Sequence, residues 1–589
     1  MDASDLYSKF WKKIVFNGKA EQVTKGLKVC RTDSETIAYV RQLLDDSGLL
    51  QQIQFIVDEK NETKAIECRK RGNENFHPRI KKYIAAIECY NESIALSNGG
   101  SKNLAIAYAN RSAVCFELKE YNACLENIRL VLQNPYPERL IPKLLQRKQC
   151  CLEMINNNHR PAHFDMILCE PKLCSKPNPK IPFISDCLEL EKNDRFGRHL
   201  VTNKKLNPGD FVVIEKPFSK MLLPNLRYMN CDYCLEDKFL ILIPCHHCSI
   251  TMFCSEMCQQ KAYQSYHRIE CPIIKHLHKL FPLKVLVPLR TTIMAISSFD
   301  YDLQDLLEHV ETLGESSLNS FDLDWTKLQA KQVYSTIHML ATNQNLRTPN
   351  EMIQLTVLCI ATSEVLLNYT PLRSFCGNIE SHRDLIRIIL FRHLQISSVN
   401  SCSINRVNYY PHGTERFKEN YIGGGLFPIL SMLNNSCAPN ITRIPLPNGR
   451  IAAIVLRPID KDGQLFCCYG YHHLHNTLFD RHPALYLKYH FKCRCEACQY
   501  DYPLRENLKH IALPSYFDID SREWIVNYRN RNIAEALKNF RKHCKFLKDY
   551  DCKYPNYEVC VSHGDFIQCL NMIYSPHSQY IKYQGLCYF

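Results

Sequence analysis

The sequence contains no long uninterrupted apolar run, and its start lacks the features of an export signal. No stretch approaches the roughly 18 consecutive apolar residues that can span a bilayer. Residues Met1 to Phe16 place acidic residues before basic ones and carry no long apolar segment, unlike a signal peptide. We therefore expect an intracellular protein with no membrane partner, located in the cytoplasm and the nucleus.

The chain also lacks a concentrated basic surface pattern. Its formal charge is +13, but the Lys and Arg residues are scattered, which argues against direct DNA binding. Hydrophobic residues make up 46% and charged residues 23% of the chain, a balance typical of soluble globular proteins. At roughly 100–200 residues per domain, the 589 residues predict about three to five units. We expect a monomer.

The N-terminal part of the chain has the pattern of a helical repeat. Tyr83-Ile84-Ala85-Ala86 recurs 38 residues later as Tyr121-Asn122-Ala123-Cys124, near the 34 residues of a tetratricopeptide unit plus a small insertion. Small residues at these positions let paired helices approach closely, and stacked pairs form a groove. Two interpretations stay open: a groove that binds a partner peptide, or a helical domain without a binding role.

Beyond the repeats the pattern changes twice. Residues 155–180 are rich in Asn, Pro and Lys and are typical of a linker. Short strands follow, with a turn at Asn207-Pro208-Gly209-Asp210, and strands return at residues 404–475. The intervening residues 275–400 have a helical period, as does the stretch from Glu523 to Leu547.

Cysteine is abundant, with 31 residues, and much of it is clustered. Disulfides do not persist in a reducing compartment, so clustered cysteines there suggest bound metal. Ligands two or three residues apart can bend around one tetrahedral ion. Eight such ligands fill two closed sites, which are structural because no position stays open for substrate. Four ligand pairs lie between residues 231 and 271, in the order Cys231-x2-Cys234, Cys245-x2-Cys248, Cys254-x3-Cys258 and His267-x3-Cys271.

Three further motifs lie in the second half of the chain. Residues 434–440 read Asn-Asn-Ser-Cys-Ala-Pro-Asn, and Phe466-Cys467-Cys468-Tyr469-Gly470 follows about thirty residues later. Cys493-x-Cys495-x2-Cys498 then supplies three thiols. Three is an odd ligand count for zinc, so a fourth ligand must come from elsewhere in the chain.

Together these motifs resemble those of the SET and MYND domain family. The spacing at residues 231–271 is similar to a MYND zinc finger, residues 434–440 resemble the SET-domain signature, and Phe466–Gly470 resembles the strand that ends in the catalytic tyrosine. The helical repeats and the run Cys468-Tyr469-Gly470-Tyr471-His472 are most similar to the fourth member of the family. The resemblance covers roughly residues 70–500.

The resemblance implies an α+β multidomain fold. It has N-terminal helical repeats, a split SET β-fold with an inserted MYND finger, a post-SET zinc site and C-terminal helices. The expected units are an N-terminal helical segment (1–65), tetratricopeptide-like repeats (66–155), a linker (156–180), the first SET part (181–230), the finger (231–271), a helical insertion (272–400), the SET core (401–475), the post-SET site (476–500) and a C-terminal helical region (501–589).

The resemblance also implies three zinc ions. In the MYND family the first and third ligand pairs bind one ion and the second and fourth pairs bind the other. The signature cysteine is the family's fourth ligand to the post-SET thiols. The implied sets are Cys231, Cys234, Cys254 and Cys258; Cys245, Cys248, His267 and Cys271; and Cys437, Cys493, Cys495 and Cys498.

The activity implied by the resemblance is protein-lysine N-methylation, with S-adenosylmethionine as the methyl donor and a lysine of a histone or non-histone protein as the acceptor. Tyr469 resembles the catalytic tyrosine, whose hydroxyl positions the amine and the methyl. The residues that resemble cofactor contacts are Arg195, Phe196 and Gly197 in a first loop, Asn400 in a second, Asn434 and Asn435 in the signature, Tyr469, Phe491, and Tyr334, with Asn343 near the same contact as Tyr334.

Two residues depart from the family pattern. Asn435 stands where histidine is usual, and Cys402 stands where some members have an aromatic residue near the lysine channel. An alternative function is therefore a catalytically weak or inactive scaffold. Its finger and repeats would bind partner peptides in transcriptional regulation.

Overall fold

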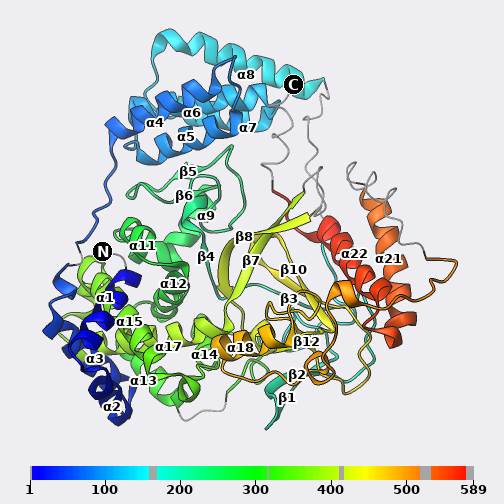
Figure 1. Cartoon of the computed structure of the whole chain (residues 1–589). Coiled ribbons are helices and arrows are strands. Elements are labelled where there is room, and N and C mark those ends of the chain that lie inside the picture. Colours follow the sequence, from blue (N-terminus) through cyan, green and yellow to red (C-terminus); the bar gives the residue numbers. More distant parts are fainter. Residues whose placement is uncertain are drawn as a thin grey trace.

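A computed structural model describes residues 3–52, 54–157, 169–314, 318–409, 417–517 and 532–578. The predicted α+β architecture is confirmed: helices surround a central group of small β-sheets (Figure 1). Part of the expected linker, residues 158–168, lies outside the described residues, as does the expected helix from Glu523 up to residue 531.

The first helices pack on the helical insertion, far away in sequence. Helix α3 (Asp33–Ser47) begins after a capping box formed by Thr32 and Glu35 and is capped at its C-terminus by Gly48, whose φ of 67° suits glycine. Its buried residues Val40 and Leu44 belong to the same core as α15 and α17. The N-terminal segment and the insertion thus form one helical body, made of α1 (Ala3–Phe16), α2 (Ala20–Val29), α3 (Asp33–Ser47), α13 (Leu303–Gly314), α14 (Ala330–His338), α15 (Pro349–Tyr369), α16 (Leu372–Cys376) and α17 (Glu380–Asn400).

Helix α15 is long and apolar enough to cross a membrane by length and composition. In the described structure, 72% of its apolar window is buried inside the protein. It contacts α3 and α17, as expected of a core helix.

The region of the predicted repeats is a stack of helices in which each helix packs on the next. Gly72 lies so close to the Tyr90 ring that an added Cβ would come within 2.4 Å of it, so a small residue is needed at this crossing. The stack lies directly over the finger (Figure 1). Its helices are α4 (Glu62–Phe76), α5 (Tyr83–Leu96), α6 (Lys102–Glu117), α7 (Tyr121–Leu132) and α8 (Ile141–Asn156).

The strands before the finger pair with strands that follow the helical insertion. One sheet has the order β10-β11-β3, a second the order β4-β8-β7, and β1 pairs with β2 in a hairpin. Short strands β9 and β12 pair in parallel. The strands are β1 (Leu188–Asn193), β2 (Gly197–Thr202), β3 (Phe211–Glu215), β4 (Ser219–Leu222), β7 (Cys402–Tyr409), β8 (Phe417–Leu426), β9 (Asn434–Asn435), β10 (Ile441–Pro445), β11 (Ile451–Val455) and β12 (Phe466–Cys467).

The predicted turn between β2 and β3 is present. The Asp210 N–H donates to the carbonyl of Asn207 at 3.1 Å, and the Asp210 carboxylate accepts from the Asn207 N–H at 2.8 Å. Gly209, with φ +98°, supplies the left-handed conformation.

The finger contains β5 (Ile243–Pro244), β6 (Met252–Phe253) and α9 (Glu256–Ala262). A short π-helix (Tyr263–His267) and α10 (Arg268–Glu270) lead into α11 (Ile274–Leu280) and α12 (Leu283–Ser297). After β12 come α18 (Leu478–Tyr489) and α19 (Glu496–Gln499). Helices α21 (Ile533–Tyr550) and α22 (Tyr557–Tyr574) share a core with β10 and β11, built around Ile444, Phe546 and Phe566.

Candidate active site and metal centres

Two neighbouring cavities lie beside the β-sheets and share part of their lining. The first, of about 1360 Å³, is lined by Arg195, Phe196, Gly197, Asn343, Asn400, Asn434, Asn435, Tyr469 and Phe491, together with other residues. The second, of about 800 Å³, is lined by Cys402, Arg443 and Cys468 among others. Five residues line both cavities, namely Val399, Asn400, Ser431, Tyr469 and Tyr489. Nearly all of the predicted cofactor residues therefore face one cavity, and Tyr469 lies on its boundary with the other.

Tyr469 follows β12 and is held at both its backbone and its hydroxyl. Its hydroxyl donates to the carbonyl oxygen of Leu433 at 2.7 Å. Its N–H donates to Asn435 Oδ1 at 2.9 Å. The rings of Tyr489 and Phe491 flank it, with centroids 4.7 and 6.4 Å away. Burial raises the pKa of Tyr469 well above its ordinary value, so the hydroxyl stays protonated at neutral pH.

The two signature asparagines connect different walls of the first cavity. They lie on β9, which pairs with Phe466 and Cys467 of β12. The amide of Asn434 donates to the carbonyl of Phe196 at 3.0 Å. The amide of Asn435 donates to Cys493 Sγ at 3.4 Å. Asn435, the residue that replaces the usual histidine, thus bridges the Tyr469 backbone and a predicted metal ligand.

The first loop is ordered by a local asparagine. Asn193 Oδ1 accepts from the N–H groups of Arg195 and Phe196 at 3.1 and 2.8 Å. Arg195 then donates to the carbonyl of Arg494 at 3.1 Å, beside the post-SET thiols. Gly197 has φ +63° and open space where a Cβ would lie, so its role is conformational.

The second loop is held by Asn400 at the end of α17. Its amide donates to the carbonyl of Ala341 at 2.7 Å. Asn343 lies in the same cavity wall, with φ 52°, and donates to the carbonyl of Tyr489 at 3.0 Å.

The structure does not bring Tyr334 to either cavity. Its side chain is fully buried in the helical core, and its hydroxyl bonds to His338 Nδ1 at 3.0 Å. It packs near the rings of Phe299 and His393. The helical pattern of α14 correctly indicates that Tyr334 is buried, but this face of α14 packs against α17 and does not line the cavity.

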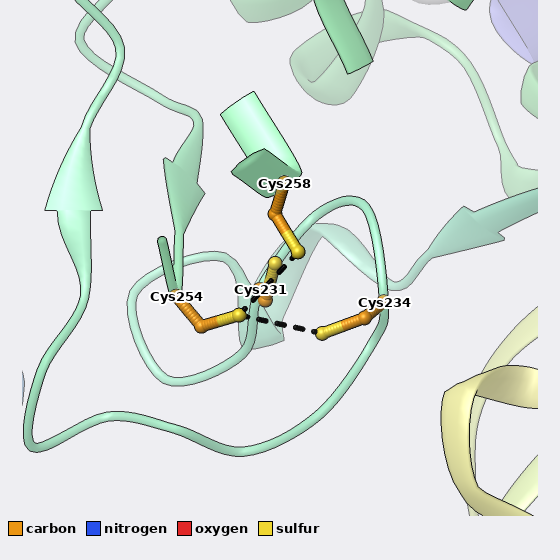
Figure 2. Close-up of side chains that lie close together, drawn as sticks. All are labelled: Cys231, Cys234, Cys254 and Cys258. Carbon is orange, nitrogen blue, oxygen red and sulfur yellow. Dashed lines mark hydrogen bonds between the residues drawn. The ribbon is translucent and has the colours of Figure 1, made fainter. Parts of the chain in front are cut away.

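The three predicted metal sets each form a compact group in which all ligand atoms lie within 4.8 Å of one another. A tetrahedron with Zn–S bonds of about 2.3 Å has edges of about 3.8 Å. In the first group, Cys254 Sγ lies 3.6 Å from Cys234 Sγ and 3.5 Å from Cys258 Sγ (Figure 2). These separations fit the edges of a zinc tetrahedron.

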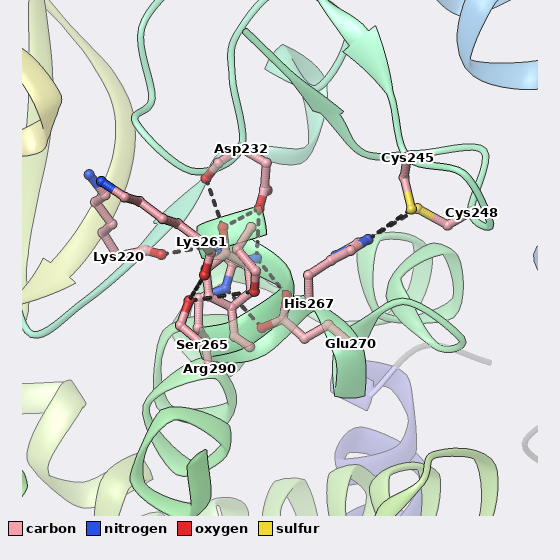
Figure 3. A network of polar contacts seen from close by, with 11 residues as sticks. Lys220, Asp232, Cys245, Cys248, Lys261, Ser265, His267, Glu270 and Arg290 are labelled. Carbon is pink, nitrogen blue, oxygen red and sulfur yellow. Dashed lines mark hydrogen bonds and ion pairs between the residues drawn. The ribbon is translucent and has the colours of Figure 1, made fainter. Parts of the chain in front are cut away.

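The second group includes the histidine. His267 Nε2 lies 3.2 Å from Cys245 Sγ and 3.7 Å from Cys248 Sγ (Figure 3). Cys245 Sγ lies 3.7 Å from Cys271 Sγ. The donor set of three thiols and one imidazole nitrogen is typical of a structural zinc site.

A buried ion network ties this part of the finger to α12 (Figure 3). Arg290 pairs with Glu270 at 2.5 Å and with Asp232 at 3.2 Å. Its guanidinium also lies 3.8 Å from the ring centroid of Tyr266. Removing one partner of such a network is costly because a buried charge is left uncompensated.

The third group joins the signature to the post-SET region. Cys437 Sγ lies 3.6 Å from Cys498 Sγ, and the Cys437 N–H donates to Cys495 Sγ at 3.3 Å. This thiol group therefore lies next to Asn435 and Tyr469, and a metal bound there would brace the wall of the first cavity.

Some site residues were not predicted as such. Tyr489 lines both cavities beside Tyr469. Arg443 donates to Cys402 Sγ and to the carbonyl of Cys468, both at 3.3 Å. Buried Glu215 accepts from the N–H groups of Ile429 and Leu430, both at 2.8 Å, and burial raises its pKa to about 8. Glu215 and Arg443 lie on strands and Tyr489 ends helix α18, and the periodicity of these elements does not distinguish site residues from core residues.

Comparison with known proteins agrees with this geometry. The SET domain family model matches residues 197–470. A Danio rerio protein, protein-lysine N-methyltransferase SMYD4, is 24% identical over 521 residues, covering 78% of this chain and 68% of its own length. The Mus musculus protein of the same name is 23% identical over 627 aligned positions, covering 87% and 76%. A SET and MYND domain-containing protein of Dictyostelium discoideum is 23% identical over 330 residues, covering 53% and 82%.

The chain contains a SET domain. The matched residues 197–470 include both the finger and the helical insertion, so the SET domain is split along the chain. The similarity to the SMYD4 proteins extends over most of the chain.

Proposed function

We propose that this chain is a protein-lysine N-methyltransferase that uses S-adenosylmethionine. The observation that carries the proposal is the pair of cavities with a common wall at Tyr469 and Tyr489. A methyl transfer needs a donor and an amine held in line, with the reacting atoms close together. Two cavities that share this wall give a donor and an acceptor separate entrances to the same region.

The residues of the first cavity fit the cofactor. Its volume is above the roughly 300–1,000 Å³ of typical small-molecule pockets, so the cofactor has room to bind. The rings of Phe196, Phe491, Tyr469 and Tyr489 line it, and aromatic faces suit both an adenine ring and a sulfonium cation. When bound, S-adenosylmethionine supplies a methyl group on a positively charged sulfur.

The second cavity is the proposed lysine entrance. A free lysine has a pKa of about 10.4, so its ammonium group must lose a proton before the nitrogen can attack. Arg443 contributes a positive charge to this cavity, and like charge together with desolvation disfavours the ammonium form. The Tyr469 hydroxyl, held by Leu433, is placed to orient the amine.

The three metal groups are proposed zinc sites with structural roles. Each has four protein ligands and leaves no position for substrate. The third group supports catalysis indirectly, because Cys493 is bonded to Asn435, which also fixes the Tyr469 backbone.

The test is methyl transfer from labelled cofactor onto a pool of lysine-containing peptides. We expect transfer by the wild type and a loss of about 10²-fold or more in Tyr469→Phe, because small misplacements of reacting groups are costly. Tyr471→Phe is the matched control, since Tyr471 lies two residues further on and lines neither cavity. Wild type that neither binds the cofactor nor transfers methyl groups would favour a non-catalytic scaffold.

A further inference from the structure

Three fully buried polar side chains line the inner face of the helical stack. Asn91, Arg111 and Asn127 come from α5, α6 and α7, and each is 0% exposed. Arg111 Nε donates to Asn127 Oδ1 at 2.7 Å, and its Nη1 donates to Asn91 Oδ1 at 2.6 Å. Burial of such groups is costly unless they are hydrogen-bonded. This ladder, made of Asn91, Arg111 and Asn127, therefore needs further hydrogen-bond partners.

The partner is the main chain of the finger and the segment just before it. Asn91 donates to the carbonyls of Tyr228 and Phe239 at 2.8 and 2.9 Å. Arg111 donates to the carbonyl of Leu242 at 2.8 Å. Asn127 donates to the carbonyl of Leu240 at 2.8 Å. The side chains of Phe239, Leu240 and Leu242 are buried in the same core.

A second set of contacts reaches the metal loop itself. Lys60, just before α4, donates to the carbonyl of Ala95 at 2.9 Å and to that of Cys245 at 2.7 Å. Asp58 accepts from the N–H and the hydroxyl of Ser249 at 3.0 and 2.5 Å. The helical stack and its leading segment therefore hold both sides of the Cys245–Cys248 loop.

We propose that the inner face of α5–α7 is a docking surface whose occupant is the segment Tyr228–Leu242 of this chain, and that docking and zinc loading of the finger stabilise each other. The bonds from the ladder to the Tyr228–Leu242 segment all go to main-chain carbonyls, so they depend on the path of that backbone and not on its side chains. A small finger takes that path from its metal. Without metal, the three buried side chains would lose their carbonyl partners in the finger segment, at a cost for each one.

Coupling of this kind is reciprocal. If zinc favours docking, docking must raise the affinity of the finger for zinc by the same free energy. At an unchanged association rate, a finger that binds zinc more tightly releases it more slowly. The same surface is also closed to a partner peptide as long as the finger occupies it. This inference does not depend on methyl transfer, since none of the contacts involves the cavities.

Hydrogen exchange on the full chain tests one direction. Cys271→Ser removes a ligand of the finger, and Cys495→Ser removes one of the post-SET group. We expect amides of α5–α7 to exchange about tenfold faster or more in Cys271→Ser, because lost bonds to a charged group are each worth roughly that factor, and to stay protected in Cys495→Ser. Unchanged exchange in Cys271→Ser would overturn the proposal, as would equal loosening in both variants.

Zinc release to a colorimetric chelator tests the other direction. Arg111→Met should release the two finger ions about tenfold faster. Arg147→Met is the matched control, because Arg147 bonds only within the stack, to Ala109 and Ser112. Lys60→Met removes the contacts to Cys245 and Ala95 but leaves Asn91, Arg111 and Asn127 in place, and it should also speed release, whereas exposed Lys64→Met should not. Release at the wild-type rate in both Arg111→Met and Lys60→Met contradicts the coupling.

Discussion

Replacing Asn435 with alanine should weaken the third metal site and the catalytic tyrosine together. The Asn435 amide is the group that joins them, with Oδ1 2.9 Å from the Tyr469 N–H and Nδ2 3.4 Å from Cys493 Sγ. Asn435 is 7% exposed, so water does not readily replace the missing amide. A buried N–H left without a partner costs about 1–3 kcal/mol. Loss of an outer hydrogen bond to a metal ligand typically costs about 10–100-fold in metal affinity or activity.

Two measurements on the same protein check this expectation. The rate of zinc release to a colorimetric chelator should rise for one of the three ions by about 10-fold or more in Asn435→Ala. Methyl transfer from labelled cofactor should fall by a similar factor, because the Tyr469 backbone loses its anchor. Asn368→Ala, which removes an exposed amide bonded only to Glu364, is the control.

The variant Asn435→His tests whether the asparagine is tolerated or marks a loss of activity. If the asparagine is a tolerated variant, Asn435→His should leave turnover within a few-fold of the wild type; if it marks decay, the change should tighten cofactor binding. Asn435→Ala that keeps wild-type zinc release and wild-type transfer would refute the bridge between the two sites.

The remaining predictions concern metal, pH and charge. Metal analysis of the pure protein should give three zinc ions per chain, and a strong chelator but not a mild reductant should unfold the finger; two ions or fewer at full occupancy would be inconsistent with the three groups. Cys437→Ser should lower both metal content and cofactor affinity, as followed by calorimetric titration, because the thiol lies beside the signature asparagines. Burial raises the pKa of Glu215 to about 8 in the fold, against about 4.3 in the unfolded chain, so its contribution to the free energy of unfolding should be highest below the unfolded pKa and should fall as the pH rises through about 8. Glu215→Gln should flatten this fall. Arg443→Met should shift the pH of half-maximal transfer upward, because a nearby positive charge lowers the pKa of the entering amine; an unshifted profile would exclude that role.

Spacing along the chain was enough to predict those contacts whose residues lie close together in the sequence. The ligand pairs of the finger lie two or three residues apart, and that spacing alone lets both members reach one ion. The turn at Asn207–Asp210 depended in the same way on neighbouring residues. The order of the motifs also placed Tyr469 and the signature asparagines, and the structure brings them to one cavity.

Which buried helix faces contact each other depends on the tertiary structure. Tyr334 has the helical pattern of a buried residue, but its ring neighbours Phe299 and His393 lie just after α12 and on α17, and not in the cavity. The first helices pack on α15, more than three hundred residues later. Asn91, Arg111 and Asn127 read in sequence as ordinary polar positions of helices, and only the packing of the stack on the finger gives them partners. Periodicity reports that a side is buried, whereas the partner of that side is a long-range contact that no local pattern encodes.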